Sequence, residues 1–171
     1  MDPFLLVLRV LHIGAGVFWV GAAFAFFLFV SPSAKALGPD AHGAFMDQVV
    51  RRRFPMVVLV AGIVTVFAGA LLYLRDSGGL SMAWISSPTG AGFTIGAAAA
   101  IVSLALGPLV ILPSISSLQA LGGRLKAEGR PPTPEEGATL DALDRRLTQV
   151  GQFDLVLLTV AVVMMATARY L

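Results

Sequence analysis

The chain contains no cysteine and only two histidines among its 171 residues. The absence of cysteine excludes disulfides, thiolate metal sites and cysteine nucleophiles. Charged residues are also scarce, at 13% of the chain against roughly 25% of an ordinary soluble domain. Hydrophobic residues make up 57%, and the few basic residues stand beside apolar runs. This pattern is typical of a membrane protein and not of a nucleic-acid-binding protein.

Four apolar runs occupy most of the sequence, at about residues 4–30, 55–74, 91–112 and 153–171. A helix needs about 20 residues to cross the ~30 Å hydrocarbon core of a bilayer. Backbone groups in lipid must form hydrogen bonds within their own segment, so we expect helices and not open strands. The sequence therefore predicts an all-α membrane protein, with four transmembrane helices in an antiparallel bundle and a single transmembrane domain over residues 1–171.

Most lysines and arginines lie in the first and third loops between these runs. The first loop contains Lys35, Arg51, Arg52 and Arg53, and the third contains Arg124, Lys126, Arg130, Arg145 and Arg146. Short loops rich in basic residues face the cytoplasm. We therefore expect a protein of the cytoplasmic (inner) membrane, with both termini outside and loops one and three cytoplasmic. The Arg51–Arg53 cluster should also attract anionic lipid headgroups.

The two halves of the chain resemble each other, which favours a duplicated helical hairpin. Pro32 and Pro113 follow the first and third apolar runs, where each is expected to bend or end its helix. Phe54 and Phe153 stand at the start of the second and fourth runs. Because each unit contains two helices, both copies would share one orientation, as two tandem hairpins in a parallel repeat.

A further helix is predicted in the third loop. Thr133-Pro134-Glu135-Glu136 matches a capping box, in which the residue three positions after the cap returns its hydrogen bond. An apolar stripe follows it, so we expect a cytoplasmic amphipathic helix at about 134–150. This helix either lies at the membrane interface or continues into the fourth membrane helix.

His12 is the sharpest functional candidate, because it is an ionisable residue within a membrane helix. At helical spacing it shares a face with Gly16, Trp19 and Ala23. A face of small residues and one large ring allows close helix packing, or makes room for a flat ligand. The structural alternative is that the imidazole bonds to a neighbouring helix or faces water.

Met164 and Met165 are candidate partners of His12, because they lie at a similar depth on the antiparallel fourth helix. Histidine with a thioether is an axial ligand set for haem and a soft ligand set for copper(I). Arg9 and Arg169 would then lie near the outer surface, where haem propionates would emerge. The alternative is that both methionines simply pack in the core or against lipid.

Asp154 falls in the first turn of the predicted fourth helix. We expect it to form an interfacial ion pair with the Arg51–Arg53 cluster or with the segment that precedes it. A role as a proton relay is the alternative, although acidic residues near a helix N-terminus need no such function.

The run Leu11-His12-Ile13-Gly14-Ala15-Gly16-Val17-Phe18-Trp19-Val20-Gly21 resembles the first helix of several small membrane families. They include the copper-resistance D (CopD)-like domain, the HemJ-type protoporphyrinogen oxidases and a group of predicted integral membrane proteins without an assigned activity. Resemblance to the oxidases implies that His12 is a haem ligand, and resemblance to the CopD-like domain implies copper handling. The overall layout is most similar to the third group, which implies no activity.

Three functions follow from these observations. The favoured one is an accessory or structural membrane protein, in contact with lipid and with a second copy or a membrane-complex partner. The first alternative is a membrane redox protein that binds haem b through His12, which would make the chain an oxidoreductase if it is an enzyme. The second alternative is a copper-handling membrane protein with His12 as the metal ligand.

Overall fold

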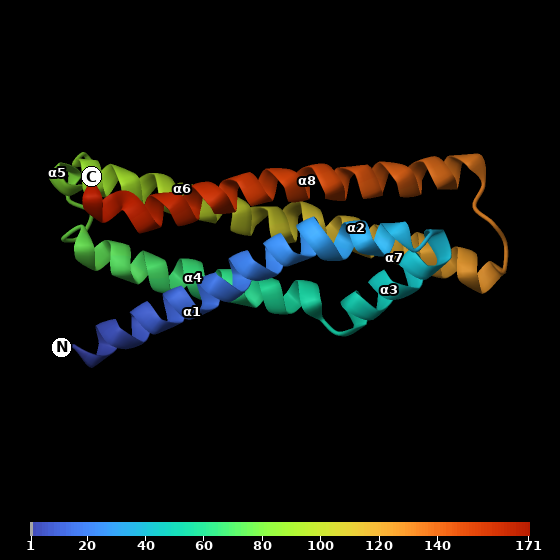
Figure 1. Cartoon of the computed structure of the whole chain (residues 1–171), viewed down its shortest axis with the longest axis horizontal. Coiled ribbons are helices and arrows are strands. Elements are labelled where there is room, and N and C mark those ends of the chain that lie inside the picture. Colours follow the sequence, from blue (N-terminus) through green and yellow to red (C-terminus); the bar gives the residue numbers. More distant parts are fainter. Residues whose placement is uncertain (1) are drawn as a thin grey trace.

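The computed structural model describes residues 2–171, which form helices and connecting turns and contain no strand. Four stretches are long and apolar enough to cross a membrane, namely Pro3–Ala36, Phe54–Asp76, Pro88–Glu128 and Pro134–Tyr170. They lie along the long axis of the molecule, and successive stretches run in opposite directions (Figure 1). The prediction of an all-α bundle with four membrane helices is confirmed, and such a chain is a membrane protein.

The elements follow the sequence in a simple order. They are α1 (Pro3–Ala25), the π-helical η1 (Phe26–Val30), α2 (Ser31–Ala36), α3 (Pro39–Arg51), α4 (Phe54–Asp76), α5 (Met82–Ile85), α6 (Pro88–Leu106), the π-helical η2 (Gly107–Ile111), α7 (Leu112–Glu128), α8 (Pro134–Thr167) and the 3₁₀ turn η3 (Ala168–Tyr170). The four membrane stretches are thus α1–η1–α2, α4, α6–η2–α7 and α8–η3.

Three of these stretches begin with a side-chain cap. Asp2 and Ser87 accept backbone N–H groups of the first turns of α1 and α6. Thr133 and Glu136 form a reciprocal capping box at the start of α8, as predicted. In each case a proline occupies the first helical position, where its missing N–H costs no intrahelical hydrogen bond.

Pro32 and Pro113 lie inside continuous helical stretches, so of the two expected outcomes, a bend or an end of the helix, the structure excludes the end. Each follows a π-helical segment of five residues, η1 before Pro32 and η2 before Pro113. A proline ring within a helix clashes with the carbonyl four residues earlier. The wider π turn absorbs this conflict, and the chain continues as α2 or α7. Both π segments have the same spacing to their proline, which supports the duplication.

The amphipathic segment at 134–150 and the fourth apolar run form one helix, α8. This is the second of the two expected alternatives. Gly151 at the junction is buried, and a Cβ there would overlap the ring of Phe27. The glycine therefore lets η1 lie directly against α8 at this point.

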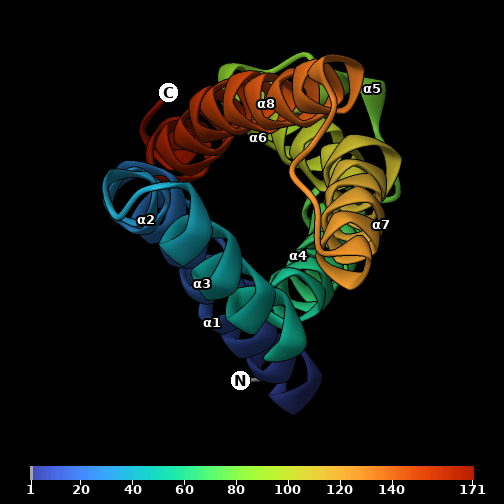
Figure 2. The ribbon, with the colours of Figure 1, turned by 90° about the vertical axis from the view of Figure 1, so that its right-hand side faces the viewer.

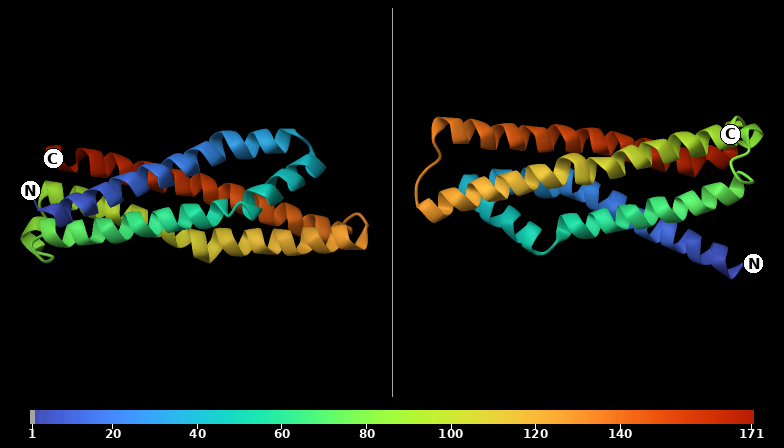
Figure 3. Two further views of the ribbon diagram at one scale, coloured as in Figure 1. Left: turned by 90° about the horizontal axis from the view of Figure 1, so that it is seen from below. Right: turned by 180° about the vertical axis from the view of Figure 1, so that it is seen from behind.

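The helices pack as two pairs, α1 with α4 and α6 with α8, and the pairs meet along α4 and α6 (Figures 2 and 3). Lipid provides no hydrophobic force between helices, so small residues that allow close approach decide where they touch. In the first pair Gly62 of α4 receives the indole of Trp19, and a Cβ there would lie 3.0 Å from the ring. In the second pair Gly96 of α6 lies against α8, and Gly92 of α6 lies against Ala168 of η3.

A buried apolar cluster lies where the two pairs meet. Trp19 and Ala23 of α1 contact Leu158 of α8, which is 1% exposed. Outer faces of the helices carry large apolar side chains, such as Val17 and Phe67, which are 70% and 66% exposed. Such a surface suits lipid and not water.

Polar contacts gather at the end of the bundle that carries the first and third loops. Lys35 of α2 bonds to Asp144 of α8 at 2.7 Å and so links the two hairpins. Arg130 bonds to Glu136 at 2.7 Å and so ties the preceding loop to the first turn of α8. The hydrogen bond to this carboxylate raises the pKa of Arg130 further above its usual range.

We expect Gly90→Ala to destabilise the protein, because a Cβ at this buried position would overlap the backbone carbonyl of Trp84. The backbone cannot rotate away as a side chain can. The substitution should therefore lower the free energy of unfolding by about 1–3 kcal/mol. Gly122→Ala is the matched control, since no atom lies within 4 Å of a Cβ there. Its higher helix propensity should leave the melting temperature in detergent unchanged or higher. Equal melting temperatures for the two variants would contradict this packing.

Candidate functional site

His12 lies in the interface between α1 and α4. Its Nδ1 is 2.8 Å from the backbone oxygen of Thr65. Gly69, one turn further along α4, makes room for the ring, because a Cβ there would lie 2.7 Å from Cε1 of His12. The imidazole therefore fills the space of a missing side chain and is held in place by a carbonyl of the neighbouring helix.

This hydrogen bond identifies a ring nitrogen that carries a proton. A carbonyl oxygen can only accept, so Nδ1 of His12 donates, and in the neutral form of the ring the lone pair lies on Nε2. No hydrogen bond to Nε2 occurs within residues 2–171, and this atom is not among the buried unpartnered polar atoms. Nε2 thus has no hydrogen-bond partner among the described residues, and its lone pair can accept a hydrogen bond or bind a metal.

The predicted face of α1 is confirmed as the face that packs against the bundle. A Cβ at Gly16 would lie 3.3 Å from the methyl group of Thr65, and the indole of Trp19 lies on Gly62. Trp19 and Ala23 are 5% and 6% exposed. We expected this face either to pack closely against another helix or to make room for a flat ligand. The structure has the close helix packing.

Met164 and Met165 lie in the other helix pair. A Cβ at Gly96 of α6 would be 3.2 Å from Cβ of Met164 and 3.3 Å from Cε of Met165. The imidazole of His12 instead faces α4, so the chain directs the histidine and the two thioethers to different neighbouring helices. The structure does not bring His12 and either methionine together. Their role as a pair of axial haem ligands is still a prediction.

Arg9 and Arg169 are exposed near the two ends of the chain. Both ends lie at the same end of the bundle (Figure 1). Within residues 2–171, neither guanidinium forms an ion pair with a described side chain. Both are thus available to an anionic group at this end, whether a lipid phosphate or a carboxylate.

Asp154 does not form the ion pair expected of it. Its carboxylate accepts a hydrogen bond from the hydroxyl of Ser103 on α6, and the residue is 6% exposed. The expectation was wrong because α8 begins at Pro134, so Asp154 lies well inside a helix and faces the interior. The contact is the polar link of the second helix pair.

Tyr73 and Thr94 form a third polar link, which sequence reasoning missed. The Tyr73 hydroxyl lies 2.6 Å from Oγ1 of Thr94 and so joins α4 to α6. Thr65, Gly69 and Ser103 were missed as well. Only the spacing of Gly62, Thr65 and Gly69 on one face of α4 could have indicated them, because a lone hydroxyl in an apolar run gives no signal of its partner.

Within residues 2–171 no group of three or more histidine, cysteine, aspartate or glutamate side chains could hold a metal ion. Comparisons with protein-family models, curated proteins and solved structures find no match to this chain. The resemblances drawn from the residues 11–21 are therefore hypotheses, and the case for a function depends on the geometry.

A double-mutant cycle tests the fit between His12 and Gly69. We expect Gly69→Ala to destabilise the protein, because its methyl group needs the space of the imidazole. In a His12→Ala background that space is empty. Gly69→Ala should then lower the free energy of unfolding by at least about 1 kcal/mol less than it does in the wild type. Thermal unfolding in detergent measures all four proteins. Additive effects would mean that the ring does not occupy this space.

Proposed function

We propose that the protein is an accessory or structural membrane protein in which His12 acts as a helix-packing residue. One observation carries this proposal: three polar contacts within the membrane stretches each join two different helices. His12 links α1 to α4, Tyr73 links α4 to α6, and Asp154 links α8 to α6. Interhelical hydrogen bonds of this kind stabilise membrane bundles and fix the register of their helices.

The exposed apolar surface supports association with other membrane components. Gly14 and Gly21 lie on the outer face of α1, beside Val10 and Val17, with no atom within 4 Å of a Cβ at either glycine. Two small residues on a lipid-facing helix allow a second transmembrane helix to approach closely. A second copy of the chain or a partner subunit would use this face.

A membrane redox protein that binds haem b is the second candidate, and the hydrogen bond of His12 favours it. A histidine ligand commonly donates its other ring N–H to a backbone carbonyl, which fixes the tautomer and orients the ligand atom. His12 has this arrangement with Thr65, and its Nε2 is unpartnered within the described residues. A haem held there would supply one-electron chemistry. No comparable observation favours copper.

An absorption spectrum and a melting curve separate these candidates. If His12 is a packing residue, protein expressed with ample haem should be colourless, and His12→Ala should lower the melting temperature. If His12 is a haem ligand, the wild type should have a Soret band that His12→Ala abolishes. Met164→Leu is a useful second variant, because loss of the band there would also identify the thioether as a ligand.

The orientation in the membrane is a separate prediction. We propose that α5 faces outside and the α7–α8 connection faces the cytoplasm, because basic residues concentrate near the latter. The chain has no cysteine, so a maleimide can react only with a cysteine introduced by substitution. In intact cells an impermeant maleimide should label Ser81→Cys but reach Ala127→Cys only after lysis. The reverse labelling would overturn the orientation.

A further inference from the structure

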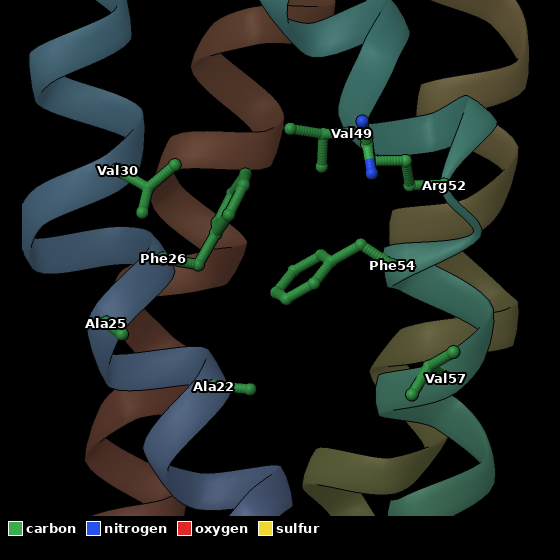
Figure 4. A pocket seen from close by; sticks show the side chains of 8 residues that line it. All are labelled: Ala22, Ala25, Phe26, Val30, Val49, Arg52, Phe54 and Val57. Atoms are coloured by element: carbon green, nitrogen blue, oxygen red, sulfur yellow. The ribbon is translucent and has the colours of Figure 1, made fainter.

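A cavity of about 430 Å³ opens between the two helices of the first hairpin, near the loop that contains α3. Figure 4 shows Phe26 of η1 and Phe54 of α4 on opposite walls, with the side chain of Arg52 above them. The lining is otherwise aliphatic and includes Ala25, Val30 and Val49. One cationic group therefore stands at the rim of an apolar groove.

The groove exists because the helices of this pair diverge. α1 and α4 are in close contact around Gly62 and separate toward α2 and the start of α4, and α3 bridges the opening (Figures 1 and 3). The rings of Phe26 and Phe54 stack with centroids 5.4 Å apart and form its narrow part. Above them, Val30 of η1 and Val49 of α3 line the groove from different helices (Figure 4).

The position of the groove along the helices matches the boundary of the hydrocarbon core. α4 begins at Phe54 and continues as an uninterrupted apolar helix, whereas the three residues before it are arginines. Arg51, Arg52 and Arg53 are exposed, and none forms an ion pair with a side chain that the structure describes. A membrane around α4 would therefore place the arginines at headgroup level and the groove at the level of the first acyl-chain segments.

We propose that this groove binds an anionic phospholipid of the leaflet next to α3, with the phosphate on Arg52 and an acyl chain against Phe26 and Phe54. The proposal goes beyond the accessory role and does not depend on it. The charge of the occupant follows from the cluster of unpaired arginines, and its apolar part follows from the lining. A soluble phosphate would use Arg52 but gain nothing from the apolar walls, so the groove fits a lipid better.

Native mass spectrometry of the purified full chain in detergent provides the test. Dioleoyl phosphatidylglycerol, dioleoyl phosphatidylcholine and soluble glycerol phosphate are the probes. We expect phosphatidylglycerol to be retained in preference to phosphatidylcholine, with no displacement by glycerol phosphate. Arg52→Gln should weaken phosphatidylglycerol binding about fivefold, the worth of one arginine at a membrane surface. The control Arg51→Gln removes the same charge outside the groove lining and should have a much smaller effect.

A second pair of variants tests the apolar part. Ala25→Leu adds bulk to the groove wall and should reduce retention of phosphatidylglycerol, whereas Ala98→Leu adds the same bulk to an exposed position on α6 and should not. Unchanged melting temperatures in all four variants show that they are folded. Equal losses in Arg52→Gln and Arg51→Gln, equal retention of the two lipids, displacement by glycerol phosphate, or full retention in Ala25→Leu would each overturn the proposal.

Discussion

The close approach of helices at glycine is the constraint on which the rest of this structure depends. In lipid, helices gain nothing by merely hiding apolar surface from their surroundings, so contact requires tight packing or hydrogen bonds. Gly62 and Gly69 accept the rings of Trp19 and His12 in the first pair. Once α1 is fixed in this way, Nδ1 of His12 falls within reach of a carbonyl on α4, and the polar contact follows from the apolar one.

The two helix pairs use glycine in different ways. In the first pair Gly62 and Gly69 of α4 lie against rings of α1, and Gly16 of α1 lies against the methyl group of Thr65. In the second pair the glycines lie on α6, where Gly96 lies against Met164 of α8 and Gly92 against Ala168 of η3. Small residues on either helix of a pair permit close approach, so the two pairs reach it with different sequences. The histidine consequently has no counterpart in the second pair, where the polar contact is made by Asp154 and Ser103.

The sequence predicted the number, type and approximate position of the membrane helices, because apolar length and missing charge are local properties. It also predicted the capping box at Thr133, where a fixed spacing carries the signal. It left open whether the helix bends or ends at Pro113, and it predicted the wrong partner for Asp154, for a shared reason. Whether a helix continues past a proline, or which way a carboxylate faces, depends on neighbours that are distant in the chain. For His12 the residue was predicted, but its partner was a backbone carbonyl, which leaves no trace in the side-chain pattern.

The groove of the first hairpin depends on a break in the backbone that the second hairpin lacks at the corresponding point. Between α3 and α4, Arg53 adopts a left-handed conformation with φ of 59°. This conformation costs an L-residue roughly 1–2 kcal/mol, and glycine usually takes the position after a helix end. In the second hairpin, the corresponding segment passes through Gln152 and Phe153 without a break, as part of α8. A straight helix would carry the Arg51–Arg53 segment away from the membrane, as α8 carries Arg145 and Arg146. The break at Arg53 instead folds α3 back over the opening between α1 and α4. As a result, the Arg51–Arg53 cluster lies beside the apolar groove.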